Sequence, residues 1–141
     1  MGGARPAARA SGVSATGTPS PGDPQQSVLL VLNDSPYGTE RSYNALRLAM
    51  SLARDPGVAL RVFLMADAAY CAQRGQQTPQ GYHNIERMLG GLGAKQVPIG
   101  ACGSCMDARG LPAEALVEGV RRSSMAELTA WTIAADKVIS F

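Results

Sequence analysis

The sequence predicts an α/β protein, a three-layer sandwich in which a mostly parallel sheet of about five strands lies between helices. The first observation is the segment 28–32, which is apolar at every position and runs into a turn-forming Asn-Asp-Ser-Pro sequence. A strand without a polar face is typical of a parallel sheet that is buried on both sides. The second observation is that helical patterns alternate with such segments, which indicates β-α-β units with right-handed crossovers.

The folded part of the chain is expected to form one domain over residues 27–141. Its length, within a chain of 141 residues, is enough for one ordinary core. Residues 1–26 contain four prolines and almost no large apolar side chain, so burial cannot offset the entropy of ordering them. We therefore expect a disordered tail. It lacks the apolar core of a secretory signal. An organelle transit peptide, a mis-assigned start codon and a cloning remnant remain as alternatives.

The first helix and the second strand are expected directly after the first strand. Residues 39–54 carry apolar side chains at the i, i+3, i+4, i+7 spacing of an amphipathic helix. Thr39 is expected to cap this helix, and Asp-Pro-Gly at 55–57 ends it. Residues 59–65 alternate apolar side chains and predict the second strand, from which 67–69 lead toward another helical region.

The second half of the chain continues the alternation of strands and helices. Residues 116–117 fit either a short strand or a helical turn, and the sequence does not decide between them. The other predicted elements are an irregular loop over 74–80, a helix over 82–92, a third strand over 96–99, a helix over 124–135 and a terminal strand at 138–139.

The reactive side chains are concentrated in the segment Ala-Cys-Gly-Ser-Cys-Met-Asp-Ala-Arg-Gly at 101–110, which follows the predicted third strand. The chain has only three cysteines and one histidine. Ligands and reactive groups of open α/β sheets gather at the carboxyl ends of the strands, so Cys102 is expected beside the ends of the first two strands. Backbone N–H groups there, and Arg109 if it folds back, would favour a thiolate. Alternatively, Cys102 is a small buried hydrophobic residue, the commoner fate of a free cysteine.

The C-x-x-C spacing of Cys102 and Cys105 fits three functions. A thiol-disulfide redox pair normally lies near the first β-α-β unit, whereas this pair follows the third strand and lacks flanking Trp and Pro. A zinc half-site needs two more ligands, and only Cys71 and His83 remain, without the tight spacing of a second ligand pair. No metal is therefore expected. The third function is a thiol that carries sulfur, with its neighbour able to resolve it.

Seven further residues are candidates for a cleft beside the thiols. For Asn33, Tyr37 and Gly38, turn chemistry is an equally good explanation. The two aspartates would tune a thiol or bind an arginine, or else lie in solvent, and the first arginine would contact an anion or an interface. The only histidine is expected to be exposed, and the third cysteine, at 71, to pack in the interior. The seven candidates are Asn33, Tyr37, Gly38, Asp67, Arg74, Asp107 and Arg109.

Composition argues against several classes of partner. The net charge is +2 and the basic residues are scattered, with one Trp and two Phe, so neither a phosphate-binding stripe nor a base-stacking surface is available and no nucleic acid is expected. No segment reaches the roughly 18 apolar residues of a membrane span. No G-x-G-x-x-G or Walker motif is present, and no cofactor is expected. An odd number of cysteines argues against a secreted disulfide scaffold and favours a cytoplasmic protein.

Several motifs, in order along the chain, resemble the DsrE/DsrF-like sulfur-relay family and, within it, the YchN-type subgroup. The resemblance covers about residues 28–141. The motifs are Asn-Asp-Ser-Pro-Tyr-Gly-Thr-Glu at 33–40, Phe-Leu-Met-Ala-Asp-Ala at 63–68, Arg-Gly-Gln at 74–76, Gly-Tyr at 81–82, Val-Pro at 97–98, the cysteine segment at 102–110 and the ending at 131–141.

The resemblance implies a compact α/β sandwich with flavodoxin-like connectivity that assembles into trimers or hexamers. It implies that Cys102 accepts sulfur as a persulfide and passes it on, so the expected partners are sulfur donor and acceptor proteins. Cys105 occurs in the subgroup but not throughout the family, and a second thiol at this spacing would release the sulfur by forming an internal disulfide. Two alternatives remain open: a non-catalytic oligomeric module that binds a ligand or partner, and a thiol-disulfide redox protein.

Overall fold

A computed structural model describes residues 23–141, so most of the predicted tail lies outside the described residues. The described chain forms one five-stranded sheet in the order β4-β3-β2-β1-β5, and every pair of neighbouring strands is parallel. The α/β prediction is confirmed. The strands are β1 (Gln26–Leu32), β2 (Val58–Leu64), β3 (Ile99–Cys102), β4 (Val120–Ser123) and β5 (Lys137–Ser140).

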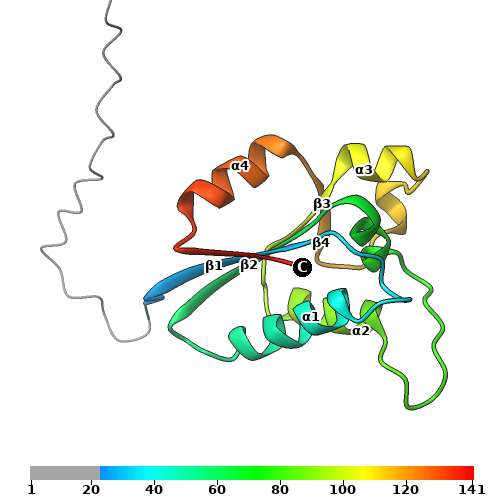
Figure 1. Cartoon of the computed structure of the whole chain (residues 1–141), viewed down its shortest axis with the longest axis horizontal. Helices are drawn as coiled ribbons and strands as arrows, with labels where there is room; N and C mark the ends of the chain where they lie inside the picture. The colour runs from blue at the N-terminus through cyan, green and yellow to red at the C-terminus, as the bar shows by residue number, and fades with distance from the viewer. Residues whose placement is uncertain (1–22) are drawn as a thin grey trace, which may run out of the picture.

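Helices cover both faces of the sheet. Figure 1 shows α1 (Arg41–Leu52) and α2 (Ile85–Ala94) on one face and α4 (Met125–Ala134) on the other. A short helix, α3 (Gly103–Ala108), follows β3 directly and lies beside the 3₁₀ helix η1 (Ala66–Ala72), which follows β2. The three layers predicted from the sequence are therefore present.

Each face of the sheet has its own core, because successive side chains of a strand point to opposite sides. On the α1/α2 face, Leu30 packs in a buried cluster with Leu46 of α1. On the α4 face, the neighbouring Leu29 belongs to a second cluster with Phe63 and Trp131, whose rings meet edge-on at 6.1 Å. The apolar segment at 28–32 is thus buried on both sides, as its composition predicted.

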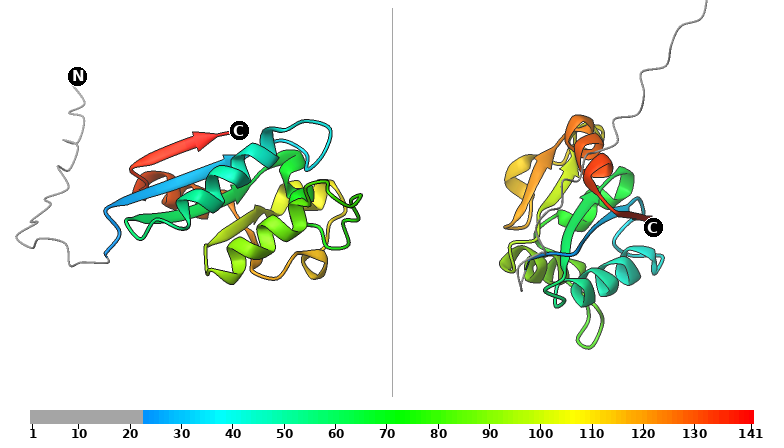
Figure 2. Two further views of the ribbon diagram at one scale, coloured as in Figure 1. Left: turned by 90° about the horizontal axis from the view of Figure 1, so that it is seen from below. Right: turned by 90° about the vertical axis from the view of Figure 1, so that its left-hand side faces the viewer.

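The path of the chain reverses once across the sheet. The first three crossovers step from β1 to β4 in one direction, and the last one returns across the sheet to place β5 on the free side of β1, where Figure 2 shows it at the edge. A right-handed crossover in the opposite direction must pass over the opposite face, which puts α4 opposite α1 and α2. A flavodoxin-like sheet, with order 2-1-3-4-5, also has its first strand second from one edge. The edge strand beside β1 is the second strand of the chain in that order, whereas in this protein it is β5, the last strand.

The third strand lies three residues later than the sequence predicted. Gln96 adopts a left-handed φ of 62° just after α2, so the strand cannot begin there. The strand instead uses small residues that look like a loop in the sequence. At Gly100 a methyl group would lie 3.0 Å from the Ser123 Cβ and 3.2 Å from the Phe63 ring, so a side chain at this position would force both neighbours to shift. Cys102 is therefore the last residue of β3, not a loop residue.

The fourth strand was not predicted, because it has no apolar run. In β4 only the first residue is buried, and Arg121 and Arg122 are exposed at this sheet edge. The undecided segment 116–117 belongs to neither a strand nor a helix, and Leu116 makes only an isolated antiparallel bridge to Gln73.

Three helix ends can be compared with the sequence. The cap of α4 is Ser124, whose side chain accepts from the Glu127 N–H, within the predicted range. The expected cap of α1 is wrong: Thr39 donates its hydroxyl to the Asp34 carboxylate at 2.6 Å, and the helix begins after Glu40 without a side-chain cap. The helix predicted from 82 begins at Ile85, capped by Asn84. No helix within residues 23–141 is long and apolar enough to cross a membrane.

Candidate functional site

The two thiols of the C-x-x-C sequence meet where β3 passes directly into α3. Cys102 is the N-cap of α3, and its Sγ accepts a hydrogen bond from the Cys105 backbone N–H at 3.4 Å. The Ser104 hydroxyl lies 3.3 Å from the same sulfur. Cys102 is only 5% exposed, and all three cysteines are free thiols. The strand-to-helix junction thus surrounds one sulfur with several hydrogen-bond donors.

The surroundings of the two thiols separate their pKa values. Burial opposes ionisation of Cys102, but hydrogen bonds from the Cys105 thiol, from Ser104 and from backbone N–H groups outweigh it, and the pKa of Cys102 lies below its ordinary value. Burial raises the pKa of Cys105, and so does the hydrogen bond that its thiol donates to Cys102. Cys102 therefore ionises before Cys105 does, and the thiolate is the more reactive form of a cysteine.

Cys105 is fixed by the end of β2 and by an arginine. Its Sγ accepts the Ala66 N–H at 3.1 Å, from a residue with a left-handed φ of 49°. Arg109 folds back over α3, donates to the Cys105 carbonyl at 3.0 Å and pairs with Asp67 at 2.9 Å. The Arg109 charge lowers the pKa of Cys105 and so partly opposes the effects of burial and Cys102. Of the two predicted carboxylate partners of Arg109, Asp67 is the one that binds it.

Asp107 binds a different arginine, one that the sequence did not single out. Its carboxylate accepts two hydrogen bonds from the Arg122 guanidinium, at 2.7 and 2.9 Å, and this contact lowers the pKa of Asp107. Arg122 stands opposite Ala101 in the β3–β4 register. Only the pairing of β4 with β3 brings it to the thiols, so no local sequence signal could have revealed it.

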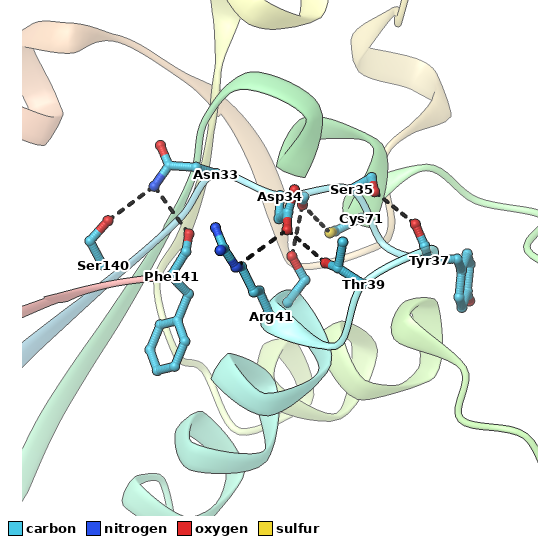
Figure 3. Close-up of polar contacts among 10 residues, drawn as sticks. Asn33, Asp34, Ser35, Tyr37, Thr39, Arg41, Cys71, Ser140 and Phe141 are labelled. Atoms are coloured by element: carbon cyan, nitrogen blue, oxygen red, sulfur yellow. Dashed lines mark hydrogen bonds and ion pairs between the residues drawn. The ribbon is translucent and has the colours of Figure 1, made fainter.

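The candidates that follow β1 serve the turn and the chain terminus. Asn33 donates its side-chain amide to the Ser140 hydroxyl at 3.0 Å and to the Phe141 carbonyl at 3.2 Å, which ties β1 to the end of β5 (Figure 3). Tyr37 donates its hydroxyl to the Gln76 side chain at 2.6 Å. Gly38 has a φ of 98°, which a turn requires of a glycine. No hydrogen bond or ion pair within residues 23–141 joins these candidates to either thiol.

The remaining singled-out residues also lie apart from the thiol pair. Arg74 donates to the Glu114 carbonyl and so fastens the long loop after η1. Cys71 is buried as expected, and burial raises its pKa to about 12. His83 was expected to be exposed, but it is half-buried between Tyr43 and Tyr82, with ring centroids at 4.1 and 4.3 Å. Among the side chains of residues 23–141, no three His, Cys, Asp or Glu groups lie close enough to hold a metal ion.

These observations define a parallel α/β protein with a pair of unequal thiols at the carboxyl edge of its sheet. The sequence profile of the DsrE/DsrF-like family matches residues 26–141, and the chain belongs to this family. It is 43% identical to the protein YchN of Escherichia coli over 117 residues, which span 82% of this chain and 99% of YchN.

A solved structure and a second sequence relative give the same assignment. The crystal structure of Escherichia coli YchN superposes with a TM-score of 0.78, with 82% of this chain and 99% of YchN covered. An uncharacterised protein of Methanopyrus kandleri is 35% identical over 114 residues, 81% of this chain and 93% of its own. A protein of unknown function from Methanobacterium thermoautotrophicum, only 16% identical, has a TM-score of 0.63 with 82% of this chain and 99% of its own covered, and shows the shared fold alone.

Proposed function

We propose that this protein is a sulfur carrier in which Cys102 accepts sulfur as a persulfide and passes it to an acceptor. The observation that carries the proposal is the pair of groups within hydrogen-bond distance of the Cys102 Sγ, the Cys105 N–H and the Ser104 hydroxyl. These donors stabilise a thiolate, which is the reactive form in sulfur transfer. The chain belongs to the DsrE/DsrF-like family, and its resemblance to the sulfur-relay proteins of this family supports the same role.

The loading step is a thiolate exchange at sulfur. The Cys102 thiolate attacks the outer sulfur of a donor persulfide, and a new S–S bond forms while the S–S bond of the donor breaks. The donor sulfur leaves with the electron pair of that bond as a thiolate, so the transfer needs no external oxidant. Delivery to an acceptor thiolate repeats the exchange, and Cys102 returns as a thiolate.

Cys105 provides a second outcome for the bound sulfur. If its thiolate attacks the inner sulfur of the Cys102 persulfide, a Cys102–Cys105 disulfide forms and hydrosulfide leaves. The raised pKa of Cys105 keeps this thiol protonated and slows that attack. The same proximity also supports a second candidate function, a reversible thiol-disulfide pair, which would cycle between dithiol and disulfide without carrying sulfur.

Mass spectrometry of the loaded protein tests the proposal. The reduced protein is treated with polysulfide, or with a cysteine desulfurase and cysteine, and its intact mass is read before and after dithiothreitol. We expect a reducible gain of one sulfur atom that Cys102→Ser abolishes and Cys71→Ser, the matched control at the buried third thiol, retains. A gain that survives in Cys102→Ser, or no gain in either the parent protein or Cys105→Ser, would refute the carrier function. Because resolution of the persulfide by Cys105 also leaves the disulfide, a loss of two hydrogens in the parent protein identifies the redox pair only if Cys105→Ser gains no sulfur.

We propose further that the protein works as a homo-oligomer, as a trimer or hexamer, in the cytoplasm. Large apolar side chains are exposed on α4 and β5: Met125 is 58% and Ile133 80% exposed, and Val138 and Ile139 of the edge strand are also accessible. Such a surface favours self-association, and three unpaired thiols suit a reducing compartment. Light scattering of the purified protein measures its size, and a monomeric mass at micromolar concentration would contradict the oligomer.

A further inference from the structure

Arg122 occupies an unusual position for an exposed side chain on an edge strand. Its guanidinium crosses from β4 to α3, where both of its contacts with the Asp107 carboxylate are short, at 2.7 and 2.9 Å. The Asp107 carboxylate raises the pKa of Arg122 above its ordinary value, and the charge of an ionised Cys102 adds a smaller contribution in the same direction. The fork of a guanidinium fits a carboxylate in one orientation only, so this contact fixes α3 against β4.

Gly103 provides the space that this contact needs. A methyl group at Gly103 would lie 2.8 Å from the Arg122 Cζ and 2.9 Å from its Nε, closer than carbon atoms approach in proteins. Gly103 does not have the positive φ that would require glycine on backbone grounds. The absence of a side chain therefore allows the guanidinium to lie directly on the backbone between Cys102 and Ser104.

We infer that Arg122 is a positioning residue for Cys102. By packing on Gly103 and binding Asp107, it holds the first turn of α3, which presents the Cys105 N–H and the Ser104 hydroxyl to the Cys102 Sγ. The inference deepens the proposed function and rests on it, because Cys102 is the residue that would bear the sulfur. The inference adds Arg122, from the neighbouring strand β4, to the thiol site. It also gives a role to Gly103, whose lack of a side chain leaves room for the guanidinium.

Folding stability does not explain the pairing of Arg122 with Asp107. The side chains of Arg122 and Asp107 are 47% and 65% exposed, and ion pairs at such exposure contribute little to folding. The neighbouring Arg121 makes a comparable contact, with Glu127 at 2.7 Å, but it lies over Trp131. Arg121 is thus a matched control on the same strand, with the same charge and an acidic partner but with no hydrogen bond or ion pair to α3 among residues 23–141.

The pH dependence of thiol alkylation tests the inference. The rate of iodoacetamide addition to Cys102 is measured against pH, with fragment-ion mass spectrometry to resolve the two thiols. In Arg122→Gln we expect the apparent pKa of Cys102 to rise by about one unit, and the rate below that pKa to fall about tenfold, because a displaced turn weakens hydrogen bonds to the thiolate. Gly103→Ala, which keeps Arg122 but displaces its guanidinium, should shift the profile the same way. Arg121→Gln should leave it unchanged, and all three variants should keep the parent melting temperature.

Two outcomes would overturn the positioning role: parent pH profiles in both Arg122→Gln and Gly103→Ala, or full restoration by Arg122→Lys. Lysine keeps the charge but lacks the two-pronged bond, so full restoration would mean that charge alone acts. The alkylation assay needs no sulfur donor. Failure of both the parent protein and Cys105→Ser to take up sulfur therefore refutes the carrier function without affecting this result. A parent that loads sulfur while Arg122→Gln and Gly103→Ala both keep the parent pH profile refutes the positioning role alone.

Discussion

The backbone N–H of Cys105 points at the Cys102 Sγ from 3.4 Å, so the two thiols of the C-x-x-C sequence are held in one turn with different roles. Cys102 receives hydrogen bonds and has the lower pKa, whereas Cys105 donates its thiol proton and has the higher one. Because the asymmetry comes from the strand-to-helix junction, it is a property of the folded protein.

The first prediction concerns the lifetime of the bound sulfur. In Cys105→Ser no thiol remains at this position to attack the persulfide on Cys102, so the loaded form should decay at least about tenfold more slowly than in the parent protein. Intact-mass measurements over time after removal of the donor give the two rates. Equal rates in the two proteins would mean that Cys105 does not resolve the persulfide.

The second prediction concerns the Ser104 hydroxyl beside the Cys102 sulfur. Ser104→Ala removes one donor from the Cys102 thiolate, which should raise the apparent pKa of Cys102 by about half to one unit. The thiolate forms above this pKa, so alkylation near neutral pH should slow and should recover at alkaline pH. A parent-like profile would show that Ser104 does not donate to the sulfur. Ser35→Ala, whose hydroxyl bonds the Tyr37 carbonyl away from the thiols, is the control.

The third prediction links the buried thiol Cys71 to alkaline stability. Its pKa is about 12 in the folded protein and near 9.0 in the unfolded chain, so between these values only the unfolded state loses the proton. The free energy of unfolding should therefore fall as pH rises above about 9, by about 1.4 kcal/mol at pH 10 from this group. Urea denaturation at pH 8 and pH 10 measures the fall.

Cys71→Ala provides the control for the alkaline effect. Without the thiol, the extra loss of stability between pH 8 and pH 10 should disappear, although the variant is less stable at both pH values because a cavity remains. The same loss in Cys71→Ala as in the parent protein would assign the effect to other groups.

The fourth prediction compares two glycines of α2. At Gly93 a methyl group would lie 3.0 Å from the Glu118 carbonyl oxygen and 3.2 Å from the Gly119 Cα, both backbone atoms that cannot move cheaply. Gly93→Ala should thus destabilise the protein by about 1–3 kcal/mol through overpacking. At Gly91 no atom lies within 4 Å of the added methyl group, and Gly91→Ala should stabilise by about 0.5–1 kcal/mol through helix propensity. Thermal unfolding of both variants measures the two changes in stability. Equal changes would contradict the close approach of backbone atoms at Gly93.

Apolar patterns in the sequence predicted both a buried strand and an exposed edge strand. The segment at 28–32 is apolar on both faces because the sheet is covered on both faces, and the terminal strand at 138–139 was found from a short apolar pair. Local sequence patterns failed to predict strands whose positions are set by tertiary packing. Gly100 looks like a loop residue but lies in a central strand, since Phe63 and Ser123 fill the space of its side chain. The edge strand Val120–Ser123 carries two arginines and has no apolar pattern at all.

The sequence by itself determined the fold class, the family and the identity of the two thiols, because these follow from apolar periodicity and from residues close together in the chain. Only the tertiary structure decided which of the two thiols has the lower pKa and what surrounds it. The ionisation of Cys102 depends on hydrogen bonds within the turn, and the partner of Asp107 proved to be Arg122, fifteen residues away on a neighbouring strand. Electrostatic and hydrogen-bonding energies depend on distances in space, and those distances are set by the pairing of β3 with β4.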